Sequence, residues 1–182
     1  MSFRQRLAII AITSISYYLL YRVNMALFGS LNFSHRVDWI FLPSGLRLAF
    51  VLLFLADGAL GIALASTLIT YLLYFDGSYI SMLLNGSMAG LAPYLARQIA
   101  IHYWHLDKDL KNLKAIGILK ISVLFALISA LVHQLWYFWS GKTDDFLASA
   151  SVMMVGDLLG TLMVLFTLKV LAPRFNPLKK QL

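Results

Sequence analysis

Cysteine is absent from the 182 residues of this chain, and charged residues make up only 13% of it. The lack of cysteine excludes disulfides, thiolate metal sites, iron–sulfur clusters and cysteine nucleophiles. A soluble domain carries ~25% charged and ~45–50% apolar residues, whereas 60% of this chain is hydrophobic. There are too few polar residues to coat a soluble core of this size. The composition therefore predicts an integral membrane protein.

Apolar runs near the ~20 residues that cross ~30 Å of hydrocarbon recur along the chain. They predict an all-α bundle of six transmembrane helices in a single domain, 1–182, with spans at 7–28, 39–56, 59–75, 79–102, 115–139 and 148–171. The first span follows a basic start, but no small-x-small cleavage site interrupts it, so it is interpreted as a retained helix. Only Asp57 and Gly58, a strong turn dipeptide, separate the second and third spans, and we expect a tight helical hairpin there.

The distribution of basic residues predicts the orientation. Of the 15 Lys and Arg residues, Arg47 lies within a span and three (Arg22, Arg36 and Lys142) fall on one side of the membrane, which leaves eleven on the other. Because Lys and Arg accumulate in cytoplasmic flanks, both termini are expected to be cytoplasmic.

Four polar side chains fall inside the predicted spans in the outer half of the membrane. Arg47, His133 and Asn85 each lie about 9 Å below the outer end of their helices at ~1.5 Å per residue, and Asp157 lies about 13 Å down. An unpaired charge at such a depth costs at least ~2.5–3.5 kcal/mol. We therefore expect the four side chains to converge inside the bundle, with Arg47 facing Asp157.

Two interpretations of this cluster remain open at this point. In the first, Arg47 and Asp157 only lock two helices together. In the second, the cluster, with His133 and Asn85, is a ligand-binding site at the floor of a water-filled pocket open to the outside, where the planar guanidinium of Arg47 binds a carboxylate or another anionic group.

Small and irregular residues surround the two charges. Pro43 and Gly45 favour an irregular start of the second helix, which lipid tolerates only where it faces protein or a cavity. Gly156 and Gly160 form a small-xxx-small surface that lets another helix approach its backbone. Both features indicate close packing around the charges.

Two stretches in this region resemble a known family. "WIFLPSGLRLAFVLLF" followed by "GALGIALAS" resembles the tryptophan-proline-x-(Ser/Thr)-Gly start, apolar helix and small-residue third helix of the first class of MASE-type integral membrane sensor domains. "VGDLLGTLMVL" is similar to the Gly-Asp-x-x-Gly signature in the last helix of that family. The resemblance marks the following residues as motif positions: Trp39, Pro43, Ser44, Gly45, Gly156, Asp157 and Gly160.

The resemblance implies a multi-pass sensor of the bacterial inner membrane, of a type usually fused to cyclase, phosphodiesterase or histidine kinase modules. This chain departs from the pattern because Trp39 is several residues from the proline, Arg47 fills a usually apolar position, and no output module follows "RFNPLKKQL". We therefore expect a stand-alone sensor-like domain that binds a small ligand from the outer side. A helix shift would pass the signal to a separate partner protein.

Two other functions stay open alongside sensing. Six helices in a chain of this length also fit the substrate-binding subunit of an energy-coupling-factor importer, although the first helix has only scattered small residues. The chain could equally be a structural subunit of a larger membrane complex. No enzymatic activity, cofactor, metal or nucleic-acid partner is expected, because no nucleophile motif accompanies Ser87 and His133 and the basic residues gather at helix ends beside the lipid bilayer.

Overall fold

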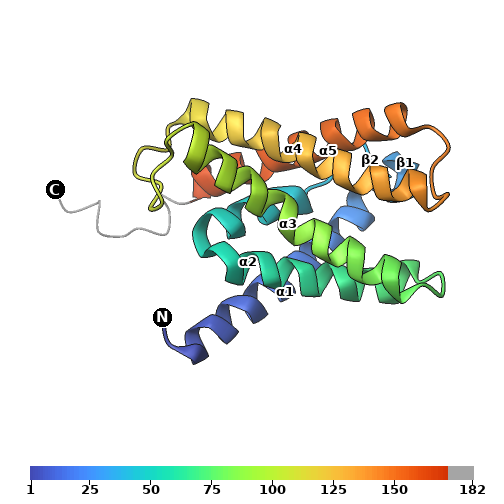
Figure 1. The fold of residues 1–182 in the computed structure, drawn as a ribbon, viewed down its shortest axis with the longest axis horizontal. Coiled ribbons are helices and arrows are strands. Elements are labelled where there is room, and N and C mark those ends of the chain that lie inside the picture. The colour runs from blue at the N-terminus through green and yellow to red at the C-terminus, as the bar shows by residue number, and fades with distance from the viewer. Residues whose placement is uncertain (172–182) are drawn as a thin grey trace.

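The computed structural model describes residues 1–171, and most of them are helical (Figure 1). The helices are α1 (Phe3–Phe28), α2 (Pro43–Tyr74), α3 (Tyr79–Tyr103), α4 (Ala115–Trp139) and α5 (Phe146–Leu171). A short 3-10 turn, η1 (Gly29–Leu31), and a hairpin of two strands, β1 (Asn32–Ser34) and β2 (Val37–Asp38), connect α1 to α2. Residues 172–182, which include the C-terminus expected in the cytoplasm, lie outside the described residues.

Four of the five helices (α1, α2, α4 and α5) are long and apolar enough to cross a membrane. Their outward faces carry large exposed apolar side chains, such as Leu64 on α2 and Leu135 on α4, as a surface in contact with lipid requires. The fifth helix, α3, has 25 residues but contains polar side chains such as Asn85 and Arg97. The chain is therefore an all-helical, multi-pass membrane protein.

Helix α2 contains two of the predicted spans and is interrupted once. Leu55 has φ 56° and ψ −128°, outside the helical region, and the two halves of α2 fold back on each other at this point (Figure 1). The reversal was predicted at Asp57 and Gly58, and that position is wrong, because both residues are helical. Gly58 matters for another reason: a Cβ on it would collide with the backbone carbonyl of Phe50, so its lack of a side chain lets the two halves meet.

The start of the second predicted span is also corrected. Residues 39–42 are not helical, and the first half of α2 begins at Pro43, where the fixed φ of proline suits the first turn of a helix. Residues 43–54 extend only about 18 Å at 1.5 Å per residue. This half-helix is too short to cross the ~30 Å hydrocarbon core by itself.

The reversal in α2 lies near the N-terminal end of α1. The guanidinium of Arg6 donates to both carboxylate oxygens of Asp57, with an Nη2–Oδ1 distance of 2.8 Å. One turn of helix further along, the hydroxyl of Ser14 donates to the carbonyl of Gly61, where a Cβ would collide with α1. Small residues of α2 therefore allow close packing against α1.

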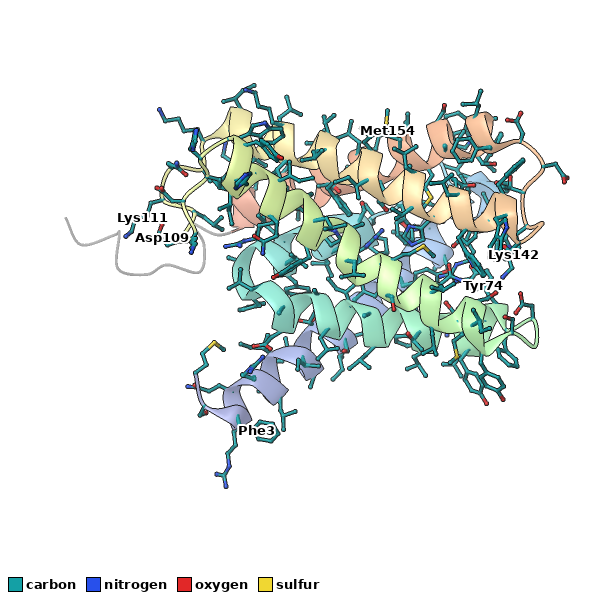
Figure 2. The ribbon with its side chains drawn as sticks, in the orientation of Figure 1. Phe3, Tyr74, Asp109, Lys111, Lys142 and Met154 are labelled. Carbon is teal, nitrogen blue, oxygen red and sulfur yellow. The ribbon has the colours of Figure 1, made fainter. Side chains whose placement is uncertain are left out.

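Polar loops mark the two ends of the bundle. Figure 2 shows Lys142 and Tyr74 at one end and Lys111 and Asp109 at the other. At the first end, the ammonium of Lys142 lies 2.7 Å from the carboxylate of Asp76 and ties the α2–α3 loop to the α4–α5 loop. The β1–β2 hairpin packs against α5 at this same end, which the charge distribution assigns to the outer side.

Candidate functional site

The segment before α2 enters the interior as extended backbone along α5. The amide of Phe41 donates to the carbonyl of Gly156 at 3.1 Å. A Cβ on Gly156 would collide with the carbonyl of Asp38, and one on Gly160 with the carbonyl of Phe41. The two glycines were predicted to receive a neighbouring helix. They receive the extended segment after β2 instead, whose carbonyl groups lie directly against the two glycines.

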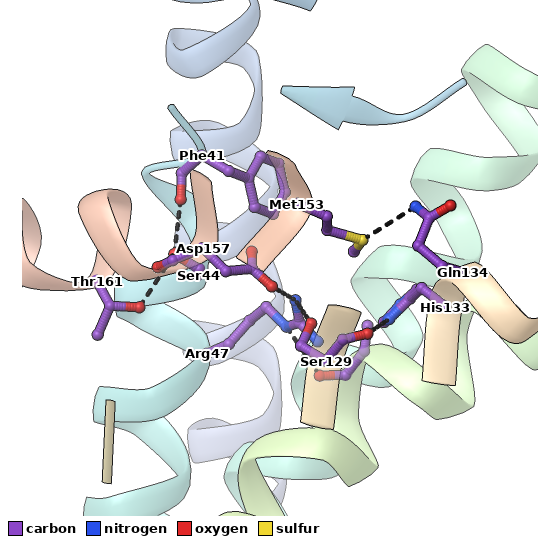
Figure 3. A network of polar contacts seen from close by, with 10 residues as sticks. Phe41, Ser44, Arg47, Ser129, His133, Gln134, Met153, Asp157 and Thr161 are labelled. Atoms are coloured by element: carbon purple, nitrogen blue, oxygen red, sulfur yellow. Dashed lines mark hydrogen bonds and ion pairs between the residues drawn. The ribbon is translucent and has the colours of Figure 1, made fainter. Parts of the chain in front are cut away.

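Ser44 fastens the first turn of α2 to α5. Its hydroxyl lies 2.7 Å from the carbonyl oxygens of both Asp157 and Phe41, and it accepts a hydrogen bond from Thr161 at 3.1 Å (Figure 3). A side chain at position 45 is excluded, because a Cβ on Gly45 would collide with Val164. The proline–serine–glycine start of α2 and the Gly-Asp-x-x-Gly stretch of α5 are therefore in direct contact.

Arg47 and Asp157 face each other inside the bundle, as the sequence predicted. Each residue is 1% exposed, and Arg47 Nη1 lies 3.8 Å from Asp157 Oδ2. The Arg47 guanidinium also donates to the carbonyl of Ala89 (3.0 Å) and to the hydroxyl of Ser129 (3.1 Å), and it lies 5.1 Å from the ring centre of Phe125 (Figure 3). Three other helices, α3, α4 and α5, therefore contribute to the surroundings of this α2 side chain.

The hydrogen-bonding capacity of this ion pair is only partly used. Charge-assisted N–H···O bonds measure ≈ 2.7–2.9 Å, so a separation of 3.8 Å is an ion pair without a direct hydrogen bond. Within residues 1–171, the two carboxylate oxygens of Asp157 accept no hydrogen bond, and Arg47 Nη2 donates none. The pair neutralises charge but leaves donors and acceptors open, which is unusual for buried polar groups.

His133 and Asn85 occupy different places around the pair. His133 lines the same cavity as Arg47 and Asp157, and its Nδ1 lies 2.8 Å from the carbonyl of Ser129. Asn85 does not line the cavity: its amide donates to the carbonyl of Ser81, and its oxygen accepts from the hydroxyl of Tyr137 at 2.8 Å. Asn85 is therefore a support for Tyr137, which does line the cavity.

The cavity around the ion pair, here called the inner chamber, has a volume of about 30 Å³. One water needs ≳ 10–15 Å³, so the inner chamber has room for one or two water molecules. Besides Arg47, Asp157 and His133, it is lined mainly by aromatic and charged side chains: Tyr17, Tyr21, Arg36, Asp38, Phe41 and Tyr137. Its polarity suits water or a charged group better than an apolar ligand.

Sequence reasoning missed the residues that α1 and the hairpin contribute to the inner chamber. Tyr17 and Tyr21 lie in an apolar run, where tyrosine is commonly an interfacial residue. A signal was present, because Thr13, Tyr17, Tyr21 and Asn24 repeat at helical spacing, and these are the buried residues of α1. Trp39 was marked by the family resemblance but is 45% exposed and does not line the chamber.

A second and larger cavity, here called the vestibule, lies beside the inner chamber at the end of the bundle that carries the β1–β2 hairpin. Its volume is about 410 Å³, and its lining includes Asn24, Asn32, His35 and Tyr74. Arg36 and Asp38 line both cavities. These two residues of the hairpin therefore form the partition between the vestibule and the inner chamber.

Arg36 is held in a specific position at the tip of the hairpin. Its backbone has φ 57°, a left-handed conformation that is uncommon outside glycine. Its Nη1 donates to the hydroxyl of Thr70 at 2.7 Å, and its guanidinium carbon lies 4.8 Å from the ring centre of Tyr74. Both contacts are to the second half of α2, so Arg36 anchors the hairpin to that helix.

Burial shifts the pKa of two neighbours of Arg36. Partial burial, with the positive charges of Arg36 and Lys142 nearby, lowers the pKa of His35 to about 4. Burial raises the pKa of Asp38, against the effects of a hydrogen bond from Asn32 and the charge of Arg36. His35 is therefore neutral at pH 7, and its ring packs edge-on against Tyr74 and Tyr137.

No protein-family model, curated protein or solved structure matches this chain.

Proposed function

We propose that this protein is a membrane-embedded ligand-binding domain of the sensor type, which takes up a small polar ligand from the outer side. The observation that carries the proposal is the Arg47–Asp157 pair, fully enclosed beneath an outer vestibule, with hydrogen-bonding atoms left open. A pair that only locked two helices would be expected to form direct hydrogen bonds, because those reduce the penalty of burying charge.

The size of the inner chamber favours sensing over passive binding. A volume of about 30 Å³ holds water but no organic ligand, so binding of a larger molecule at Arg47 must move the surrounding elements. The hydroxyl of Ser44 donates to the carbonyl of Asp157 and ties the first half of α2 to α5, so we expect these two elements to move together relative to α4. Only a ligand that binds one arrangement better than the other transmits a signal, here to a separate partner protein.

The proposed setting is the bacterial inner membrane, with six segments that enter the membrane and both termini in the cytoplasm. The six segments are α1, the two halves of α2, α3, α4 and α5. The motif resemblance supports the bacterial location, and the Arg6–Asp57 pair supports a reversal of α2 on the side of the N-terminus. Because the chain has no cysteine, single cysteines at Thr143 and Asp109 should label with a membrane-impermeant maleimide from opposite sides.

The first test is native mass spectrometry of the gently solubilised protein. We expect the wild type to carry a small bound mass that is lost in Arg47→Ala and retained in Arg22→Ala. Arg22 is a matched control, because it is an exposed arginine of α1 that donates to Tyr18 and lines neither the inner chamber nor the vestibule. A bare wild-type chain, or one that arrives only with other membrane subunits, would contradict the proposal and favour a structural subunit.

A substrate-binding transport component is the second candidate, and one observation favours it. Helix α2 is discontinuous, and its short first half starts in the interior beside a charged pair. Transporters often build substrate sites from such broken helices near the bilayer midplane. Purification with an ATPase and a transmembrane coupling subunit would favour transport, whereas a partner with a cyclase or kinase module would favour sensing.

A further inference from the structure

Arg36 lies in the partition between the two cavities and forms no salt bridge with the described residues. Within residues 1–171, no carboxylate lies within 4 Å of its guanidinium, whose contacts are the Thr70 hydroxyl and the face of the Tyr74 ring. An arginine side chain has five N–H donors in a planar fork that matches a carboxylate. Most of these donors remain available to a group in the vestibule or the inner chamber.

Asp157 offers the complementary group on the far side of the partition. Its two oxygens accept no hydrogen bond from the described residues, and the nearest guanidinium nitrogen, of Arg47, is 3.8 Å away. A carboxylate has about four acceptor sites. A group with several N–H donors would fill them better than the single contact that Arg47 makes.

The surface between these two residues is aromatic. Tyr17, Tyr21, Phe41 and Tyr137 line the inner chamber together with Arg36 and Asp157. The negative faces of aromatic rings attract ammonium groups, and tyrosine hydroxyls add hydrogen-bonding partners. This lining therefore suits a cationic group next to Asp157.

We infer that the ligand is a small zwitterion of the amino-acid class, with its carboxylate on Arg36 and its ammonium group at Asp157. This inference rests on the proposed function, because it names the ligand of the same site. A simple anion would leave the acceptors of Asp157 without donors and would meet its negative charge. A simple cation would leave the open N–H donors of Arg36 without an acceptor.

The two cavities explain how such a ligand reaches the site. The vestibule, at about 410 Å³, is large enough for an amino acid, whereas the inner chamber, at about 30 Å³, is not. Displacement of Arg36 and Asp38 would join the two spaces. The hairpin that carries them is held by the Arg36–Thr70 hydrogen bond and by a 3.2 Å contact between the hydroxyls of Ser34 and Ser149. A carboxylate that draws Arg36 away from Thr70 therefore opens the partition.

The test is thermal unfolding of the protein in lipid nanodiscs with added probes. The zwitterions are glycine, β-alanine and 4-aminobutanoate, which separate the two charges by increasing distances, and the half-ligands are acetate and methylammonium. We expect one zwitterion to raise the melting temperature in proportion to the logarithm of its concentration above Kd, and neither half-ligand to do so at the same concentration.

Variants at the partition assign the carboxylate to its residue. Arg36→Gln keeps a hydrogen-bond donor near Thr70 but removes the charge, so the apparent affinity for the zwitterion should fall about tenfold or more. Arg22→Gln, at an exposed position of α1, should bind as the wild type does. Unchanged affinity in Arg36→Gln would overturn the assignment to Arg36.

Other outcomes separate this inference from the proposed function. A shift with acetate or with methylammonium equal to that with the zwitterions would overturn the zwitterion and leave a ligand site. No shift with any probe, while native mass spectrometry finds another bound mass that is lost in Arg47→Ala, would do the same. No shift and no bound mass would refute both.

Discussion

Arg47 and Asp157 come from different helices and meet with an Nη1–Oδ2 distance of 3.8 Å in surroundings that leave each of them 1% exposed. Removal of one partner leaves an uncompensated buried charge, which typically costs about 3–5 kcal/mol. We expect Arg47→Ala and Asp157→Asn each to lower the free energy of unfolding substantially.

A double-mutant cycle measures the coupling of this pair. The variant with both substitutions should be more stable than the sum of the two single losses predicts, because it contains no unpaired charge. Thermal unfolding in nanodiscs provides the measurement, and Arg22→Ala should stay within about 0.5 kcal/mol of the wild type. Strictly additive effects would show that the two charges do not stabilise each other.

Gly160 and Gly29 form a matched pair for testing the contact between α5 and the extended segment. A Cβ on Gly160 would collide with the carbonyl of Phe41, whereas nothing lies within 4 Å of a Cβ on Gly29. Overpacking costs about 1–3 kcal/mol, so Gly160→Ala should be destabilised by roughly that amount. Gly29→Ala should melt close to the wild type. Equal melting temperatures for the two variants would contradict the close approach.

The reversal of α2 predicts an unusual response to glycine. Leu55 has φ 56°, a conformation that costs a leucine energy but that glycine adopts freely. Leu55→Gly should therefore leave stability unchanged or raise it. Leu53→Gly, at an exposed helical position two residues earlier, should cost about 1 kcal/mol. A loss at Leu55 as large as that at Leu53 would contradict the break.

His35 makes the stability of the hairpin end of the bundle depend on pH. Its pKa is about 4 in the folded protein and ≈ 6.5 when unfolded, so the unfolded chain binds more protons between these values. The stabilising contribution is complete above pH 6.5 and decreases as the pH falls toward 4. The charges around His35 are those of Arg36, Lys142 and Asp76, and the ion pair with Lys142 lowers the pKa of Asp76, so that carboxylate titrates below this window.

Melting curves between pH 7.5 and 5 check this effect. His35→Phe keeps an aromatic ring beside Tyr74 and Tyr137 but cannot titrate, so its melting temperature should vary less over this range than that of the wild type. His102→Phe, at an exposed position near the C-terminal end of α3, should retain the wild-type dependence on pH. An unchanged slope in His35→Phe would exclude His35 as the source.

Composition and the cost of buried charge were sufficient to predict the helical membrane protein and the pairing of Arg47 with Asp157, because hydrocarbon leaves few alternatives for a charged side chain. The position of the chain reversal could not be predicted. Turn propensity favoured a reversal at Asp57 and Gly58. In the structure, Asp57 instead forms an ion pair with Arg6, and Gly58 packs against the backbone of Phe50. Local sequence propensity carries no information about such tertiary contacts.

Part of the site was hidden for a similar reason. The pattern of Gly156 and Gly160 predicts a close approach but does not say whether a helix or an extended segment makes it. Arg36 was counted only as a charge outside the membrane, because its fold back toward Thr70 depends on the hairpin. Long-range placement of this kind needs information from the whole chain.

The extended segment before α2 also constrains the order in which the protein is made. The amide of Phe41 and the hydroxyl of Ser44 donate to the carbonyls of Gly156 and Asp157 on α5. The ribosome synthesises these two residues only after the rest of α2, α3 and α4. Until α5 is synthesised, the Phe41 amide lacks this acceptor, which lipid does not replace, although the Leu42 amide can already donate to Asn24 of α1 and the Ser44 hydroxyl to the carbonyl of Phe41. We therefore expect the first half of α2 to reach its final position only after α5 has been synthesised. A chain truncated before α5 would lack Asp157 and therefore the buried ion pair with Arg47.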